Sequence, residues 1–212
     1  MYCIIVNPNA GKGKGKKNLK TVLKLFSERG AEYSVFETTR AGEAKEFSER
    51  LTSSGEQEII VVGGDGTLHE VVNGLFIQQE VCPSDVLLAV VAVGTGNDWV
   101  RTFGISNRYQ DAAKAISEGY SFLQDVGVVS YEEAHYRQSR YMVNVAGAGY
   151  EAQVVRCFNH LKKSGTSRYP IAFQGRRDRQ TYCFLCSTGI GNNKVGGKRI
   201  QSPLHTLHRC IK

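Results

Sequence analysis

The residues most suited to chemistry form a glycine-rich loop between an apolar run and a helix-forming stretch. The loop is Gly63-Gly64-Asp65-Gly66-Thr67, and it follows the apolar run 59–62. A β-branched run of this kind predicts a buried parallel strand. Glycines after such a strand let a large group approach the main chain, and the N-terminus of the next helix attracts anions. The loop therefore predicts a phosphate-binding site.

Two side chains of this loop have alternative interpretations. Thr67, with Glu70 three residues later, has the spacing of a capping box at the start of a helix. An acid such as Asp65 usually acts on phosphate through a metal ion or a proton. The competing interpretation is that Asp65 only caps the turn and that the glycines belong to an ordinary strand-to-helix turn. We take Asp65 as the leading functional candidate.

A second candidate loop follows the N-terminal apolar run. Asn7, Pro8 and Gly11 come after the predicted strand 2–6, and glycines then alternate with lysines up to Lys17. No Gly-Lys-Ser/Thr sequence falls at the spacing of a Walker A motif. The lysines could therefore be phosphate ligands or only a solvated basic face, whereas Asn7 and Gly11 are predicted to be functional.

The third candidate loop, Gly94-Thr95-Gly96-Asn97-Asp98, follows the apolar run 86–93. Two glycines, a hydroxyl, an amide and a carboxylate can hold a polyphosphate or an adenine-bearing ligand and orient metal-bound water. Asp98 could instead be only a helix cap. Its position after a buried strand, with a second acidic loop expected beside it, favours a functional role.

The elements around these loops alternate between strands and helices. This order predicts βαβ units, a mostly parallel sheet and right-handed crossovers. Ligands of such sheets bind at the carboxyl ends of the strands, so the three loops should meet in one crevice. The predicted strands are 2–6, 31–37, 58–62 and 86–93, and the predicted helices are 18–29, 41–53 and 68–76.

Composition limits the classes of protein that the chain could be. With 212 residues, 41% of them hydrophobic, it can bury a substantial core. The net charge of +7 favours an anionic partner, which could be a nucleotide, a nucleic acid or an acidic membrane surface. The longest apolar run, 86–93, is too short to span a bilayer. Six cysteines without a signal-peptide pattern predict reduced thiols in the cytosol, and a metal site at Cys183 and Cys186 is disfavoured.

The three loops, in this order and at this spacing, resemble the catalytic domain of the diacylglycerol kinase and sphingosine kinase family of lipid kinases. The resemblance covers residues 1 to about 155. The loop 63–67 alone also occurs in NAD kinases and phosphofructokinases, but the loop 94–98 followed by Trp99 and Arg101 points to lipid kinases. Val93 stands where the family usually has proline, which affects loop rigidity rather than chemistry.

The resemblance implies ATP and Mg²⁺ as cofactors and assigns most of the site. The implied nucleotide-binding residues are Asn7, Gly11, Gly63, Gly64, Gly66, Thr67, Thr95, Gly96 and Asn97. The implied acidic network with Mg²⁺ and water comprises Asp65, Asp98 and Asp125. Glu151 occupies the acidic position that would face the cleft between two domains, and the implied catalytic residues are Asp65, Asp98 and Glu151.

The resemblance also predicts two domains. Residues 1–125 would form an α/β nucleotide-binding domain like that of NAD kinases and diacylglycerol kinases, and residues 126–212 an incomplete antiparallel β-sandwich. A hairpin would open the second domain, with strands 125–129 and 140–145 and a charged turn over 131–139. The segment 144–152 also fits a dinucleotide-binding pattern, but no acid follows at the spacing that a ribose needs.

The predicted function is an ATP-dependent lipid kinase that transfers the γ-phosphoryl group to a lipid hydroxyl, in the first instance diacylglycerol, giving phosphatidic acid. After the position of Pro203 the family continues with an acid thought to be the general base, and this chain ends at Lys212 without it. We therefore expect a C-terminally truncated kinase of impaired activity. The alternatives are a nucleotide-binding fragment or pseudoenzyme without catalysis, and an NAD kinase-like enzyme.

Expectations about partners and location follow from the resemblance. It implies a lipid substrate at a membrane surface, peripheral association with that membrane from the cytoplasm, and no nucleic acid partner. The excess of lysine and arginine would strengthen contact with acidic lipids. A homodimer is left open.

Overall fold

The described part of the chain is built around a mixed sheet. The structure, a computed structural model, describes residues 1–144, 146, 194–195, 198–199 and 205–211. The chain divides into two compact units, residues 1–143 with 202–212, and residues 144–201. In the second unit, the short strands β7 (Lys194–Val195) and β8 (Lys198–Arg199) pair antiparallel. The predicted site residue Glu151 and the pair Cys183 and Cys186 lie outside the described residues.

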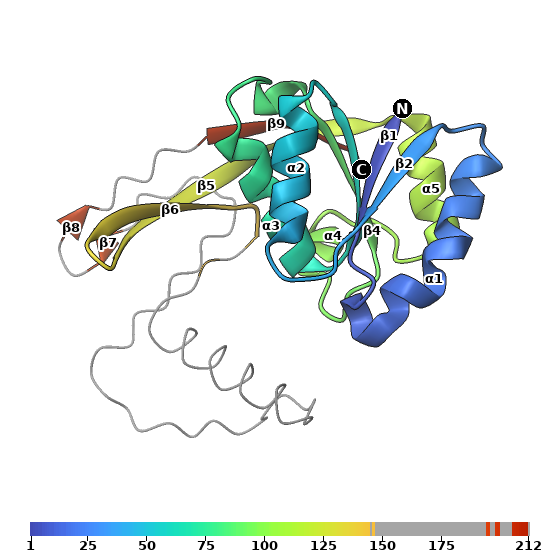
Figure 1. Ribbon diagram of the computed structural model, residues 1–212, viewed down its shortest axis with the longest axis horizontal. Coiled ribbons are helices and arrows are strands. Elements are labelled where there is room, and N and C mark those ends of the chain that lie inside the picture. The colour runs from blue at the N-terminus through green and yellow to red at the C-terminus, as the bar shows by residue number, and fades with distance from the viewer. Residues whose placement is uncertain (145, 147–193, 196–197, 200–204, 212) are drawn as a thin grey trace. The chain divides into compact units, whose positions relative to one another are not determined.

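The first unit contains a seven-stranded sheet (Figure 1). Its strands are β1 (Tyr2–Val6), β2 (Tyr33–Glu37), β3 (Glu58–Gly63), β4 (Leu87–Ala92), β5 (Ser121–Glu133), β6 (Tyr136–Met142) and β9 (His205–Ile211). They lie in the order β2-β1-β3-β4-β9-β5-β6. The first four are parallel and β9 runs parallel to β4, whereas β5 is antiparallel to both β9 and β6. The predicted α/β class with a mostly parallel sheet is confirmed.

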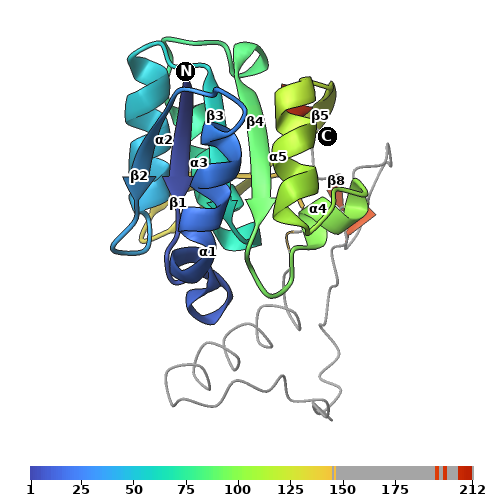
Figure 2. The same ribbon diagram turned by 90° about the vertical axis from the view of Figure 1, so that its right-hand side faces the viewer.

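Helices cover both faces of the parallel strands (Figure 2). α2 (Glu43–Ser53) and α3 (Asp65–Ile77) pack on one face, and α1 (Ala10–Ser27) and α5 (Tyr109–Glu118) pack on the other. Neighbouring strand residues therefore pack into different cores. Ile5 lies in the core covered by α2 and α3, and Ile4 lies in the core covered by α1 and α5. Burial on both faces explains why these strands are continuous apolar runs rather than alternating ones.

Two helix starts differ from the sequence-based expectation. α1 begins at Ala10 rather than at residue 18, although Gly11, Lys12 and Gly13 have positive φ angles of 59°, 61° and 86° that interrupt it. α3 begins at Asp65, with Gly64 at its N-cap and no side-chain cap hydrogen bond. The predicted capping box of Thr67 and Glu70 is therefore wrong. Thr67 lies inside the helix, and its hydroxyl instead accepts a hydrogen bond from Asn7 Nδ2 at 3.2 Å.

The β5–β6 hairpin is present, with a shorter turn than predicted. Ladder pairing continues to Glu133 and Tyr136, so the turn is only Ala134 and His135 rather than 131–139. Both turn residues have positive φ, 50° and 69°, as a tight two-residue hairpin turn requires. The charged residues that suggested a loop lie on exposed parts of paired strands. β5 passes through position 125, where the domain boundary was predicted, and that boundary stays a prediction.

The buried Asn73 side chain links α3 to β6 through hydrogen bonds. Its side chain is 2% exposed, and its amide bonds both backbone groups of Tyr141: Nδ2 donates to the carbonyl at 2.8 Å, and the N–H donates to Oδ1 at 3.0 Å. The Phe76 and Tyr141 rings stack beside this pair with centroids 4.6 Å apart. A buried amide with both ends satisfied in this way fixes the hairpin against the helix that follows β3.

Replacing Gly74 by alanine should destabilise the protein. A Cβ at this position would lie 2.2 Å from the carbonyl oxygen of Lys45 and 2.9 Å from the backbone nitrogen of Glu49, so α2 and α3 would have to separate. We expect a loss of about 1–3 kcal/mol in the free energy of unfolding, measured by urea denaturation. Gly66→Ala in the same helix is the control, because nothing lies within 4 Å of its Cβ position. Equal losses in the two variants would contradict the close approach of α2 and α3.

Candidate functional site

The three predicted loops meet at one edge of the sheet. The backbone hydrogen bonds of the ladder continue into them: Asn7 N donates to Val62 O at 3.0 Å, and Val93 N donates to Gly63 O at 2.9 Å. Figure 2 shows β1 and β4 running toward the same edge, where α4 (Asp98–Thr102) and the start of α1 also lie. The parallel arrangement thus brings the three loops together as the sequence predicted.

Glycines allow these loops to touch through their backbones. A Cβ on Gly64 would lie 3.1 Å from the Cα of Gly94, and a Cβ on Gly94 would lie 2.6 Å from Asn97 Oδ1. Gly11 has φ of 59°, and a Cβ there would lie 1.9 Å from the carbonyl oxygen of Val93. A Cβ on Gly63 would lie 2.6 Å from the Thr67 hydroxyl. A larger residue at Gly11, Gly64 or Gly94 would separate the loops, and one at Gly63 would displace the Thr67 side chain.

Asp65 ties the loop after β3 to the loop after β4. Its Oδ1 accepts a hydrogen bond from the backbone N–H of Trp99 at 3.0 Å, and its Oδ2 accepts one from the N–H of Asp98 at 3.2 Å. Asp65 therefore satisfies the first free N–H groups of α4, a helix distant in sequence. This is a capping role, although not at the turn that contains Asp65 itself.

Asp65 and Asp98 are brought together, and Asp125 is placed differently. A Cβ built on Gly96 would lie 3.1 Å from Asp65 Oδ2 and 3.7 Å from Asp98 Oδ2, so both oxygens face the space around Gly96. Asp125 is exposed on β5 between the buried residues Gln124 and Val126, which point to the opposite face of the strand. Within the described residues, no group of three or more His, Cys, Asp or Glu side chains is arranged to hold a metal ion.

Magnesium ions bind oxygen ligands and often use only one or two protein carboxylates, with water and substrate phosphates completing the shell. The two converging carboxylates of Asp65 and Asp98 fit that requirement. Each Asp65 oxygen accepts one backbone N–H and retains a second lone pair. The pair can therefore hold a hydrated cation without giving up its contacts to α4.

Asn97 occupies a strained and incompletely satisfied position in the third loop. Its φ of 55° is in the left-handed region, and its Nδ2 donates to Gly94 O at 3.0 Å. Among the buried side-chain nitrogen and oxygen atoms of the described residues, Asn97 Oδ1 is the one without a hydrogen-bond partner. Its neighbours Thr95 and Gly96 are exposed. A buried acceptor without a donor is costly, so this loop is suited to rearrange around a ligand or water that supplies one.

Trp99 anchors the start of α4 in the core. The side chain is 2% exposed, and its Nε1 donates to Gln124 Oε1 at 2.8 Å. Gln124 Nε2 in turn donates to Val143 O at 2.8 Å. Phe103 packs against the indole with ring centroids 5.0 Å apart. Gln124 was missed by sequence reasoning, because no motif marks a buried amide that lies 25 residues from its partner.

A cleft of about 230 Å³ opens beside the first two loops. It reaches across the loop after β1, the loop after β2 and the first turns of α2 and α3. Residues 38–41 in its wall were not predicted, although their position after a parallel strand was a signal for this edge of the sheet. The lining residues are Asn7, Asn9, Thr38, Thr39, Arg40, Ala41, Ala44, Thr67 and Glu70.

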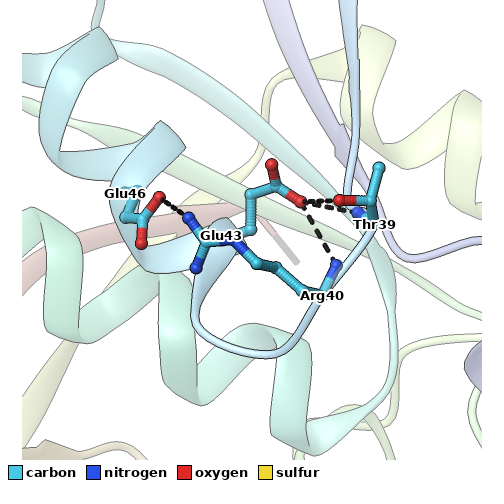
Figure 3. A network of polar contacts seen from close by, with 4 residues as sticks. All are labelled: Thr39, Arg40, Glu43 and Glu46. Carbon is cyan, nitrogen blue, oxygen red and sulfur yellow. Dashed lines mark hydrogen bonds and ion pairs between the residues drawn. The ribbon is translucent and has the colours of Figure 1, made fainter.

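Glu43 fixes the loop after β2 (Figure 3). Its Oε2 accepts hydrogen bonds from the backbone N–H of Thr39 at 2.6 Å, the Thr39 hydroxyl at 2.9 Å and the N–H of Arg40 at 3.3 Å. These contacts, the Thr39 N–H foremost, lower the pKa of the Glu43 carboxyl below its ordinary value. The carboxylate is therefore ionised at neutral pH and holds Thr39 and Arg40 at the rim of the cleft.

Known proteins resemble this chain in sequence and in fold. A crystal structure of a diacylglycerol kinase from Bacillus anthracis aligns with a TM-score of 0.58 and 27% identity, over 76% of this chain and 53% of that one. The diacylglycerol kinase of Staphylococcus aureus strain MRSA252 is 35% identical over 151 residues, which is 71% of this chain and 44% of the relative. The diacylglycerol kinase of Staphylococcus carnosus is 36% identical over 146 residues, 69% of this chain and 44% of the relative.

The match to a family model covers the part of the chain that carries the site. Residues 1–129 match the model of the diacylglycerol kinase catalytic domain, and this range includes the three loops and the cleft. The chain spans less than half the length of the curated relatives it matches. With the model matched over more than half of its residues, this chain belongs to the family defined by the diacylglycerol kinase catalytic domain.

Proposed function

We propose that the chain binds ATP in the cleft beside α3 and belongs to a lipid kinase that transfers the γ-phosphoryl group to the hydroxyl of diacylglycerol. The observation that carries the proposal is the continuity of this cleft with the first turn of α3. Thr67 lies in that turn and in the cleft wall, and Asn7 reaches it from the loop after β1. The names of the relatives support the lipid acceptor.

The chain's own residues would act by positioning the phosphates. The backbone N–H groups of the first turn of α3 have no side-chain cap and would be available to phosphate oxygens, and Gly66 leaves open space beside that turn, since nothing lies within 4 Å of its Cβ position. Gly63 and Gly64 bring the main chain close to that space, and Asn7 and Thr67 add side-chain hydrogen bonds. Phosphoryl transfer depends mainly on such positioning and on charge neutralisation. Thr95, Gly96 and Asn97 would form the opposite wall.

Asp65 and Asp98 would hold the Mg²⁺ that accompanies ATP. A bound Mg²⁺ bridges phosphate oxygens and neutralises charge that develops during transfer. Asp65 also keeps the loop after β4 in place through its two backbone contacts, so the loop geometry and the metal site depend on one carboxylate. Asp125 remains a predicted member of the acidic network, and Glu151 remains a predicted catalytic residue.

The acceptor and its surface are further parts of the proposal. Diacylglycerol lies in membranes, and among the described residues no helix has the length and apolarity to cross one. α1 carries the exposed lysines Lys14, Lys16, Lys17 and Lys20, which we name the basic patch. The first 27 residues contain no Asp or Glu, so no acid of this segment offsets the patch. We propose that it contacts acidic lipids from the cytoplasmic side.

Asp65→Asn should weaken binding of Mg²⁺ and ATP by about tenfold or more, because it removes a carboxylate charge and one acceptor oxygen from the loop. Isothermal titration calorimetry of the full chain with ATP and Mg²⁺ measures this. The same titration with NAD tests the NAD kinase alternative. Asp85→Asn is the matched control, since Asp85 is exposed and lies outside the cleft lining.

Undiminished ATP binding by a folded Asp65→Asn protein would contradict the proposed site. Incubation of the full chain with labelled ATP and diacylglycerol in mixed micelles then distinguishes between two functions. Formation of phosphatidic acid supports the kinase, and Asp65→Asn should lower its rate by about two orders of magnitude. ATP binding without any transfer supports a nucleotide-binding protein that lacks catalysis.

Charge reversal in the basic patch should release the protein from acidic membranes. The double variant Lys16→Glu and Lys20→Glu changes two lysines one helical turn apart on α1, and each basic residue near an anionic surface is worth up to about 1 kcal/mol. We expect at least a tenfold weaker partition onto phosphatidylserine vesicles in a sedimentation assay. The control is Arg108→Glu at the N-cap of α5 together with Lys114→Glu within α5, because Asp111 and Glu118 already pair with these two cations. If the partition of the wild-type protein onto these vesicles did not change with salt concentration, the proposed contact between the basic patch and acidic lipids would be contradicted.

A further inference from the structure

Arg40 is the only lysine, arginine or histidine among the residues that line the cleft. The other lining side chains are neutral except Glu70. A cleft for a polyanionic ligand needs positive charge, and the α3 N-terminus supplies only partial charge from backbone dipoles. Arg40 is thus the one full positive charge that the described cleft wall can offer.

The backbone of Arg40 is fixed by a hydrogen bond, whereas its guanidinium group takes part only in an exposed ion pair. Glu43 accepts the Arg40 N–H at 3.3 Å and so sets the backbone at the cleft rim. One guanidinium nitrogen, Nη2, donates to Glu46 Oε2 at 2.5 Å (Figure 3). The two side chains are 59% and 54% exposed. Ion pairs this open to solvent add little stability, so the guanidinium can exchange partners at low cost.

Phosphate is a better partner than a single exposed carboxylate oxygen. A guanidinium presents five N–H donors in a planar fork, and this fork can bind two phosphate oxygens at once. The contact to Glu46 occupies one nitrogen, so a phosphate could share the guanidinium with Glu46 or replace it. Glu46 lies one helical turn beyond Glu43 on α2 and outside the cleft lining.

We propose that Arg40 is a phosphate-binding residue of the cleft, held at the rim by Glu46 until a nucleotide phosphate takes the guanidinium. This inference rests on the proposed ATP site and adds the cation that recognises its phosphates. Arg40 would favour nucleotides over nucleosides, because an adenosine without phosphates offers it no anion.

The test compares phosphate-bearing and phosphate-free ligands on the full chain. Binding of ATP, ADP and adenosine is measured by calorimetry for the wild type and for Arg40→Ala, Arg40→Lys and Glu46→Gln. Arg40→Ala should weaken ATP and ADP by about ten- to a hundredfold, the range for a hydrogen bond to a charged group, and should leave adenosine within about twofold. Arg40→Lys should recover part of the loss, and Glu46→Gln should bind ATP at least as tightly as the wild type.

Arg50→Ala is the matched control. Arg50 lies on α2, outside the cleft lining, with its guanidinium 5.3 Å from the centroid of the Phe47 ring. The Arg50→Ala variant loses the same charge, from the helix that follows the Arg40 loop, and thermal unfolding of each variant verifies the fold. A wild type that binds ATP, together with an Arg40→Ala variant that binds it equally well, overturns this inference alone. Equal losses for ATP and adenosine, or equal losses in Arg40→Ala and Arg50→Ala, also overturn it. A wild type that binds no ATP overturns the proposed function and this inference with it.

Discussion

The site depends on the hydrogen bonds between the Asp65 carboxylate and the backbone N–H groups of Asp98 and Trp99. Adjacent parallel strands bring two loops to one edge of the sheet, but adjacency does not fix how the loops face each other. A charged acceptor that takes two free N–H groups of α4 does fix it, because a helix start without such partners would have to find water. The position of Asp98 follows from this contact.

A buried polar chain continues from this contact into the sheet. Trp99 donates to Gln124, and Gln124 donates to the carbonyl of Val143. Both side chains are almost completely buried, so each unmade hydrogen bond would cost the desolvation of its group. The C-terminal end of the third loop, at Asp98 and Trp99, is thereby bonded both to Asp65 and to strand β5. Asn97, directly before these two residues, keeps a buried acceptor without a partner. The loop is held where it enters α4, and its unpaired acceptor lies next to that anchored end.

Much of this arrangement could be predicted from the sequence, because it depends on residues that are close together in the chain. The apolar runs ending at Val6, Val62 and Val93 mark buried parallel strands, and the glycines that follow mark loops at one edge of the sheet. What could not be predicted depends on partners far apart in the chain. Thr67 bonds Asn7 instead of capping its own helix, and Asn73 bonds Tyr141 across 68 positions. The turn at Ala134 and His135 contains no glycine, so its tightness had no sequence signal.

Acidic and basic side chains lie on different sides of the candidate site. The acids that face each other, Asp65 and Asp98, come from the loops after β3 and β4, whereas the cation of the cleft, Arg40, comes from the loop after β2. A ligand that carries both phosphates and a divalent cation matches this separation, because its metal can meet the acids while a phosphate meets the arginine. Asp98 pairs with Arg101 at 3.5 Å and Arg40 pairs with Glu46, and such a ligand would share or replace these exposed ion pairs. In the proposed ATP site, the first turn of α3 would join the cleft, which Thr67 lines, to the acid pair that contains Asp65.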